Sequence, residues 1–307
     1  MKATKSWRHA AIVAAALSAT ACGGDSAVPP PPPPQLPPPP AAPPPTSAPA
    51  LLTERGQIDA AFALLELVQV HARLSTSALD FPLPTASTMP TSGPCALGEG
   101  SFQISLVPTL PSPAPGSSRR LSVRLSNCLV DGLVGIRLDG KQLAEIAADE
   151  GSGPGDFSAG LVLDAMHGVG SLGLWSPIGD VTAVGGGSLQ SVQVNGETIR
   201  TFMPTSGSRL TNNATTAVAT FGGGTYEIAS DRTISGGSFH YRDLRFSING
   251  TPYVLDGTYR LGYAGGTMRL IGSGEVQITS DGVLVARLLV EADGWPRAEV
   301  FKPLTPF

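Results

Sequence analysis

Two pairs of acidic residues have a spacing that could serve catalysis. Glu145 with Asp149, or Asp156 with Asp164, could supply the general acid and general base of a glycoside hydrolase. Such an enzyme also needs aromatic subsites that hold the sugar, and none accompanies either pair. The pairs therefore define no active site, and the sequence predicts no catalytic residue.

Two glycine patterns approach known phosphate-binding loops, but neither has the required context. Residues 135–142 (GIRLDGKQ) approach G-x-x-x-x-G-K-[ST], yet Gln142 replaces the hydroxyl residue and the segment alternates like a strand. Residues 168–173 (GVGSLG) fit G-x-G-x-x-G without a βαβ unit around them. Among 37 glycines such matches arise by chance, so the sequence predicts no cofactor.

Other reactive groups are sparse. His71, His167 and His240 are scattered singly, which indicates structural or solvent-facing roles, and no His or Cys pair has the spacing of metal ligands. The sequence contains no G-x-S-x-G nucleophile motif. The net charge of -4 and the lack of a Lys/Arg cluster argue against nucleic acid as a partner. These features favour a non-catalytic protein over an enzyme.

The first residues are ordered like an export signal. Residues 1–9 carry three positive charges, and residues 10–17 are apolar but too few to span a membrane. Residues 19–22 (ATAC) resemble the bacterial lipobox, with Ala where that family favours Leu. The resemblance implies that residues 1–21 are a lipoprotein signal peptide and that Cys22 becomes the acylated N-terminus. The alternative is an ordinary signal peptide, which would leave a free thiol without evident use.

An exported, lipid-anchored chain has further consequences. Gly23 is not the Asp that retains lipoproteins in the inner membrane of enteric bacteria, so the resemblance implies the outer membrane of the cell envelope. The lipid makes the membrane the first expected partner. Cys95 and Cys128 then remain in an oxidising compartment, where an even number of cysteines predicts a disulfide. Two buried free thiols are the alternative.

Residues 22–50 form the acylated N-terminus and a Pro-rich linker. Its proline run predicts an extended polyproline helix that acts as a semi-rigid stalk. A proline-rich segment can also dock into an aromatic groove. Directly after a lipid anchor, a spacer is the favoured interpretation.

Residues 51–75 show apolar residues at three- and four-residue steps, which predicts one amphipathic helix. Thr53 is the expected N-cap. Asp59, Glu66 and Arg73 repeat every seven residues and form a narrow polar stripe. A helix packed on its own β domain is favoured over a partner-binding coiled coil, because two heptads are too few for the latter.

Residues 76–94 form a Pro/Ser/Thr-rich connector, and residues 95–307 show the pattern of strands and turns. Apolar and polar residues alternate in segments such as 101–107 and 121–127, and seven Asn-Gly or Asp-Gly pairs mark tight hairpins. We therefore expect an all-β body, an antiparallel meander that forms a barrel or a sandwich. Its apolar side requires closure, a second sheet or the helix as cover.

Two segments share a pattern that indicates a repeat. Each has a serine, Ser126 or Ser247, followed by Leu-Asp-Gly at 138–140 or 255–257. The spacing between serine and Leu-Asp-Gly differs between the two segments. The sequence leaves open whether they are a true repeat or two hairpins built from similar parts.

The region around Cys95 and Cys128 resembles a pattern in uncharacterised β-rich exported lipoproteins of proteobacteria. In that pattern a cysteine and glycines open a strand, and a second cysteine closes the next strand before an Asn/Asp-Gly hairpin. The resemblance covers about 50 residues, and Gly98 and Gly100 are what remains of the family's paired glycines. The resemblance implies the disulfide and the strand order, and it implies no particular activity.

These features favour a membrane-anchored lipoprotein with a non-catalytic binding or structural body on a polyproline stalk. Its second partner would be an unknown protein, an envelope component or a small hydrophobic ligand. The alternatives are a periplasmic enzyme of hydrolase type and a carrier of a small hydrophobic molecule. A deep apolar cavity would favour the carrier, whereas a Ser–His pair or converging carboxylates in a cleft would favour the enzyme.

Overall fold

The computed structural model describes part of the chain. The described residues are 51–77, 92–95, 97–107, 118–131, 135–147, 156–173, 175–176, 178–231, 236–263 and 270–307. The predicted signal peptide, Cys22 and the Pro-rich linker lie outside them. The described residues belong to one compact unit, which spans residues 48–307.

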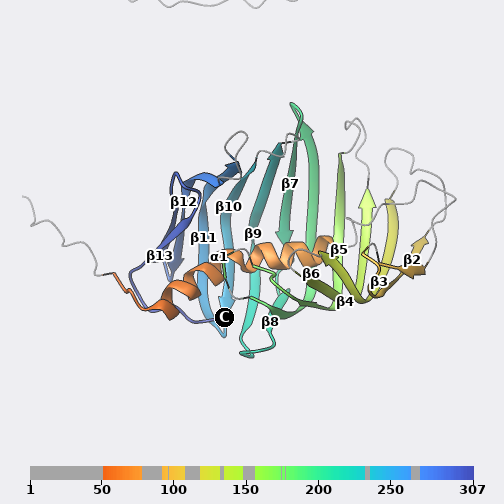
Figure 1. Cartoon of the computed structure of the whole chain (residues 1–307), viewed down its shortest axis with the longest axis horizontal. Helices are drawn as coiled ribbons and strands as arrows, with labels where there is room; N and C mark the ends of the chain where they lie inside the picture. The colour runs from red at the N-terminus through yellow and green to blue at the C-terminus, as the bar shows by residue number, and fades with distance from the viewer. Residues whose placement is uncertain are drawn as a thin grey trace, which may run out of the picture. The chain divides into compact units, whose positions relative to one another are not determined.

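Within the described residues this unit contains one helix and fourteen strands (Figure 1). In chain order they are α1 Arg55–Thr76, β1 Ser92–Pro94, β2 Ser101–Val107, β3 Ser118–Asp131, β4 Ile136–Ala147, β5 Phe157–Val169, β6 Asp180–Val194, β7 Glu197–Pro204, β8 Arg209–Asn212, β9 Val218–Asp231, β10 Gly236–Ile248, β11 Thr251–Tyr263, β12 Leu270–Ser280, β13 Val283–Val290 and β14 Pro296–Val300. The predicted all-β class with one preceding helix is confirmed.

All fourteen strands belong to one antiparallel sheet, and their order in the sheet follows the chain. The exception is β7 and β8. Both lie between β6 and β9, and each pairs with a different part of these two long strands. Tight hairpins produce this order. Asn195, Asn249 and Asp281 have φ near +50°, and the glycine after each also has a positive φ, as a type I′ turn requires. The predicted antiparallel meander is therefore confirmed.

Helix α1 lies across the strands and covers one face of the sheet (Figure 1). It packs against β5, β6, β7 and β9, and also against β13 and β14 near the other end of the sheet. Because strands so far apart in the sheet contact one helix, the sheet curves around it. Most residues of α1 are buried, as expected of a helix that is apolar on nearly all sides. No helix among the described residues is both long and apolar enough to cross a membrane.

The start of α1 corrects one prediction. Thr53 is not the N-cap; Glu54 occupies that position and makes no side-chain capping bond. The reason lies in tertiary structure: the Leu52 N–H donates to the Val300 carbonyl at 2.7 Å and extends the edge at β14. The chain is therefore still extended at Leu52, and the helix begins at Arg55.

A β-bulge bends the hairpin of β3 and β4. The register shifts after Leu125, and Asn127 adopts a φ of 49°. Its backbone N–H donates to Oδ2 of Asp139 at 3.0 Å. Gly140 beside it has a φ of 142°, and a Cβ there would lie 2.8 Å from the Met166 backbone. The bulge adds local bend and twist, which helps the sheet curve around α1.

The hairpin of β10 and β11 contains a β-bulge of the same kind. Asp243 has a φ of 47° at a register shift, and its N–H donates to Oδ2 of Asp256 at 3.1 Å. Gly257 follows with a φ of 138°. The two hairpins are therefore similar in structure. Asn127 corresponds to Asp243, so Ser126 and Ser247, which share the sequence pattern, do not occupy equivalent positions.

Cys95 and Cys128 form a disulfide that closes the base of the first long hairpin. Their Cα atoms lie 5.7 Å apart. Strands β2 and β3 pair from Ser101 opposite Ser126 onward, which brings the start of β2 beside the end of β3. Both cysteines are buried. The predicted bridge between the first strands of the β body is confirmed.

Candidate functional site

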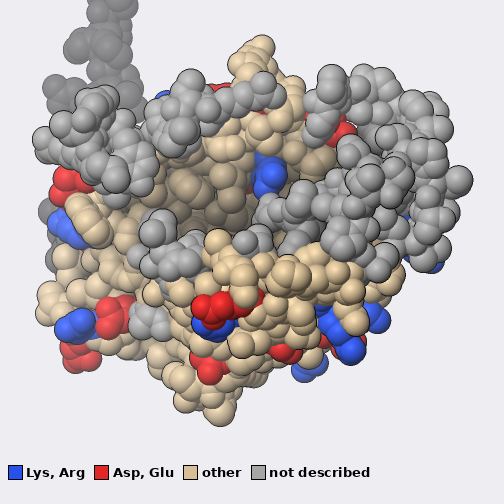
Figure 2. All heavy atoms as spheres, turned by 45° about the vertical axis from the view of Figure 1, so that its right-hand side comes forward, with Lys and Arg blue, Asp and Glu red and all other residues tan. Residues whose placement is uncertain are grey.

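The concave face of the sheet is not completely filled by α1. A pocket of about 1050 Å³ remains between the helix and strands β6, β7, β9 and β10. Figure 2 shows this hollow among mostly uncharged side chains, with a basic side chain inside it. A pocket of this size is at the upper end of the range for small-molecule sites.

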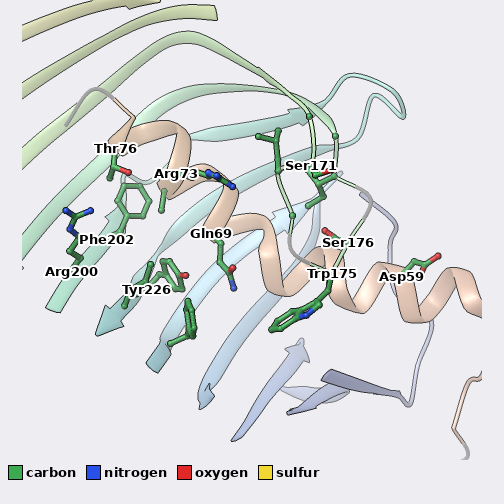
Figure 3. Close-up of a pocket in the computed structure, with 18 of the residues that line it drawn as sticks. Asp59, Gln69, Arg73, Thr76, Ser171, Trp175, Ser176, Arg200, Phe202 and Tyr226 are labelled. Carbon is green, nitrogen blue, oxygen red and sulfur yellow. The ribbon is translucent and has the colours of Figure 1, made fainter. Parts of the chain in front are cut away.

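Aromatic side chains form much of the pocket wall. Phe202 on β7, Tyr226 on β9 and Phe239 on β10 line it from the sheet, and Trp175 lines it from the segment between β5 and β6 (Figure 3). Tyr259 on β11, the cross-strand partner of Phe239, flanks this wall on the same face of the sheet. Its ring stacks on Phe239 with centroids 4.6 Å apart and lies 5.6 Å from Trp175. The wall offers flat apolar surface to a ligand.

A polar network fixes the base of this wall to α1. Gln69 Nε2 donates to the hydroxyls of Tyr241 at 2.5 Å and Tyr259 at 2.9 Å. The Tyr241 hydroxyl donates to the Leu65 carbonyl at 3.3 Å. Burial raises the pKa of Tyr241 and of Tyr259 well above the usual range. Both phenols therefore stay protonated and hold the helix in place rather than act as bases.

The segment between β5 and β6 crosses α1 and is held by a buried carboxylate. Glu66 is fully buried and accepts hydrogen bonds from the backbone N–H of Trp175 at 2.7 Å and of Ser176 at 2.8 Å, and from the Ser176 hydroxyl. Glu66 belongs to the narrow polar stripe of the predicted helix, and the structure buries this member of the stripe. The crossing segment covers this side of the helix and supplies the donors that a buried carboxylate needs.

Charged side chains of the pocket lie toward its two ends. Arg55 and Asp59 line it near the start of α1 and form an ion pair at 3.8 Å. Arg73, near the other end of α1, and Arg200 on β7 also line it. Among the described lining residues, Asp59 is the single carboxylate. The end of the pocket near Arg73 is therefore more basic than the end near Arg55.

His71 is buried on α1 among aromatic rings. Its ring centroid lies 4.7 Å from Phe221 and 5.6 Å from Phe202. Neither ring nitrogen has a hydrogen-bond partner, and burial lowers the pKa of His71 to about 3. The ring is therefore neutral and is not among the pocket-lining residues, so His71 is a core residue rather than a catalytic base.

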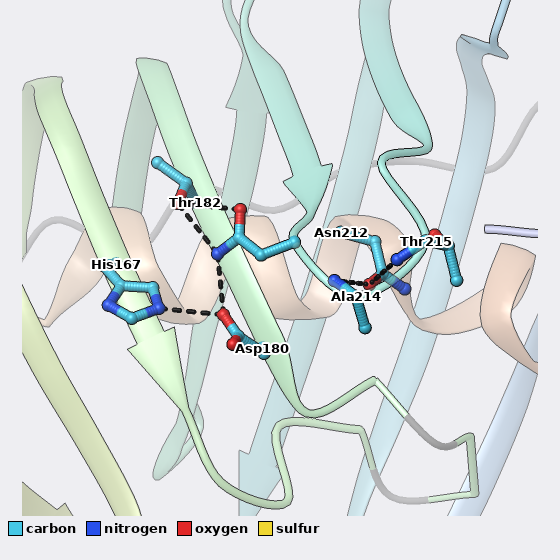
Figure 4. Close-up of polar contacts among 7 residues, drawn as sticks. His167, Asp180, Thr182, Asn212, Ala214 and Thr215 are labelled. Carbon is cyan, nitrogen blue, oxygen red and sulfur yellow. Dashed lines mark hydrogen bonds and ion pairs between the residues drawn. The ribbon is translucent and has the colours of Figure 1, made fainter.

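His167 takes part in a surface network instead (Figure 4). Its Nε2 lies 2.8 Å from Oδ1 of Asp180, which also accepts a hydrogen bond from the Asn213 amide at 2.6 Å. These bonds, that of Asn213 foremost, lower the pKa of Asp180. The nearby Thr182 hydroxyl bonds to Asn213 rather than to the histidine. The network braces the chain after β8 against β6 and does not activate a nucleophile.

Of the two carboxylate pairs with catalytic spacing, the pair that lies within the described residues, Asp156 and Asp164, is not brought together. Glu145 forms an exposed ion pair with an arginine of β3, and Asp149 lies outside the described residues. Asp156 precedes β5 and accepts the Gln193 backbone N–H at 2.7 Å. Asp164 lies further along β5 by eight residues of extended chain, roughly 25 Å. That separation is too long for an acid–base pair on one glycosidic bond.

The glycine patterns also serve structure. Gln142, which occupies the hydroxyl position of the first pattern, is buried on β4. Its amide donates to the Ser75 carbonyl and accepts from the Ser77 hydroxyl, so it holds the end of α1. Residues 168–173 run from the end of β5 into the segment that crosses α1. Within the described residues, no group of three or more His, Cys, Asp or Glu side chains could hold a metal ion.

Comparison with known proteins gives no match to a family model, to a curated protein or to a solved structure. The function of this protein is therefore inferred from its pocket and from the sequence features of its N-terminus. Sequence reasoning missed the pocket residues, among them Trp175, Phe202 and Phe239, because no local motif connects them. The available signal was inward-facing aromatic residues on separate strands.

Proposed function

We propose that this protein is a lipid-anchored binding protein of the bacterial cell envelope that holds a small hydrophobic molecule beside α1. One observation carries the proposal: the pocket of about 1050 Å³ has a wall of aromatic side chains from β7, β9 and β10. Its described lining contains no histidine and a single carboxylate, Asp59. Such a lining suits binding by apolar contact and lacks the groups of a general acid–base mechanism.

The first test addresses the pocket. The chain from residue 22 onward, with Cys22→Ser so that no acyl chain competes, is titrated with the neutral probe N-phenyl-1-naphthylamine. We expect saturable fluorescence enhancement with one probe per protein. Phe239→Ala should weaken probe binding about tenfold, because an aromatic contact of the wall is lost.

A matched aromatic residue outside the pocket provides the control. Trp295, at the turn before β14, is 63% exposed and is not among the pocket-lining residues. Trp295→Ala should leave the affinity for the probe unchanged. Equal losses in the Phe239→Ala and Trp295→Ala variants, or no saturable binding to the parent chain, would contradict the pocket as the site.

The second test addresses the anchor. In a bacterial host, metabolic labelling with a radioactive fatty acid should mark the full-length chain, and Cys22→Ser should abolish the label. The lipid would attach the β body to the membrane through the predicted linker of residues 22–50. Three acyl chains, as in the lipoproteins that the N-terminus resembles, give stable anchoring where one chain does not. Unchanged labelling of the Cys22→Ser protein would refute the anchor.

A further inference from the structure

We infer that the hydrophobic ligand of this pocket carries one neutral hydroxyl group, and that Tyr226 and Gln69 recognise it. The inference rests on the binding function proposed above and adds the chemical class of the ligand: an apolar alcohol or phenol. One feature of the pocket carries it. Three tyrosines stand on neighbouring strands, and the hydroxyl of Tyr226 has no hydrogen-bond partner among the described residues.

The three tyrosines come from β9, β10 and β11. Tyr226 is the cross-strand partner of Tyr241, and their ring centroids lie 5.3 Å apart. The ring centroids of Tyr241 and Tyr259 lie 6.3 Å apart. Side chains of directly paired residues leave the same face of a sheet. The Tyr226 hydroxyl therefore lies near that of Tyr241, on the face that α1 covers.

Gln69 on α1 serves two of these tyrosines and leaves out the third. Its Nε2 carries two hydrogens, and it donates them to the hydroxyls of Tyr241 at 2.5 Å and of Tyr259 at 2.9 Å. The amide therefore has no hydrogen left for Tyr226. Its Oε1 accepts no hydrogen bond from any described residue, although Gln69 lines the pocket (Figure 3). An acceptor thus remains free near Tyr226.

The Tyr226 hydroxyl is the matching donor. The residue is only 2% exposed, yet it lines the pocket. Its hydroxyl is not sealed among protein atoms, as the two unpartnered nitrogens of His71 are. Burial raises the pKa of Tyr226 well above its usual range, so the phenol keeps its proton and can donate. A buried hydroxyl without a partner is unfavourable, so a ligand that supplies the partner binds more tightly.

A hydroxyl is the ligand group that fits both protein groups. Its oxygen accepts from Tyr226, and its hydrogen is donated to Oε1 of Gln69. A carbonyl or an ether would satisfy Tyr226 alone. Arg73 and Arg200 also line the pocket, but both already have interaction partners, so they do not call for an acidic ligand. The aromatic wall would hold the apolar body of the ligand.

The experiment compares three ligands that share one planar body. β-Naphthol, its methyl ether and naphthalene displace N-phenyl-1-naphthylamine from the Cys22→Ser chain at pH 7.5. The first ligand can donate and accept a hydrogen bond, the second can only accept, and the third does neither. We expect β-naphthol to bind at least about fivefold tighter than each of the others, although apolar contact alone favours naphthalene.

Tyr226→Phe removes the hydroxyl and keeps the ring. The variant should bind β-naphthol about fivefold more weakly, and its affinity for naphthalene should stay within about twofold of the parent, which also shows that the pocket is intact. Equal weakening of both ligands would mean that Tyr226 acts through its shape alone, and would overturn the inference.

A matched tyrosine provides the control. Tyr253 on β11 is also 2% exposed, but it is not among the pocket-lining residues. Its hydroxyl accepts the Thr305 N–H at 2.8 Å. Tyr253→Phe removes the same atom and should keep the preference for β-naphthol. If this variant loses the preference as Tyr226→Phe does, the effect is not one of the pocket and the assignment to Tyr226 is overturned.

The outcomes separate this inference from the proposed function. If the methyl ether binds as tightly as β-naphthol, Gln69 accepts no hydrogen bond from the ligand and the hydroxyl is overturned. Saturable binding of all three ligands with equal affinity, or a Tyr226→Phe variant that keeps the preference, would overturn the inference and leave the hydrophobic pocket standing. Absence of binding by these ligands and by the neutral probe would overturn the proposed function, and this inference with it.

Discussion

Between pH 7 and pH 4.5 the free energy of unfolding should fall by about 3 kcal/mol because of one buried histidine. The pKa of His71 is about 3 in the folded protein, against about 6.5 in an unfolded chain. Below pH 6.5 the unfolded chain therefore binds a proton that the folded protein does not bind. Stability is full above pH 6.5 and is lost toward pH 3, at about 1.4 kcal/mol per pH unit.

The variant that tests this is His71→Phe, because the new ring can pack against Phe202 and Phe221 as the imidazole does. It removes two buried nitrogens that have no hydrogen-bond partner. We expect the loss of stability between pH 6.5 and pH 4.5 to disappear. At pH 7 the variant should be about 1 kcal/mol more stable. Urea unfolding followed by circular dichroism at pH 7, 5.5 and 4.5 measures both effects.

Other titrating groups can be separated from His71. His240 faces outward on β10 and contacts Thr258, so His240→Gln is the matched control and should keep the wild-type pH dependence. Asp180 has a lowered pKa, and its contribution is lost only as pH falls below the ordinary aspartate range, under pH 4. If His71→Phe and wild type lose stability in parallel between pH 6.5 and 4.5, burial of neutral His71 is not the cause.

Removal of the disulfide should lower the free energy of unfolding by about 4 kcal/mol. The bridge between Cys95 and Cys128 closes a loop of 33 residues, and the chain-entropy model gives this magnitude for such a loop in the unfolded state. Both residues are buried, so the double variant Cys95→Ala with Cys128→Ala avoids burying new hydroxyls. Its melting temperature should be about 10 °C below that of wild type.

Chemical reduction gives an independent version of the same experiment. Wild type in excess reductant should melt near the temperature of the double alanine variant, and that variant should not respond to reductant. Thiol titration of the denatured, unreduced chain with Cys22→Ser should find no free thiol. Two titrated thiols, or a double variant that melts with wild type, would show that the bridge does not stabilise this protein.

The features predictable from sequence are those whose physical cause is local. Apolar residues at every second position and the Asn-Gly or Asp-Gly turns both occur within the sequence of a single hairpin. The antiparallel meander can therefore be predicted from them. The disulfide also follows, because pairing of residues 101–107 with 121–127 places Cys95 and Cys128 at one end of a hairpin.

The features that sequence reasoning missed depend on residues far apart in the chain. Glu66 has the spacing of a surface residue, but the N–H groups that bury it come from Trp175 and Ser176, about 110 positions later. The start of α1 depends on the contact of Leu52 with the last strand. The pocket combines side chains from α1 with those of several strands, so no window of sequence contains its pattern.

The position of α1 inside the curved sheet also determines how late during synthesis the folding of this protein can be completed. The helix is the first element of the β body to leave the ribosome, yet it packs against β13 and β14, the last two strands. The Gln57 side chain accepts the Leu304 N–H across a separation of 247 residues. Almost the whole chain must therefore emerge before this apolar helix is fully covered. Until then it is exposed to aggregation for longer than any hairpin of the meander, whose partners emerge in succession.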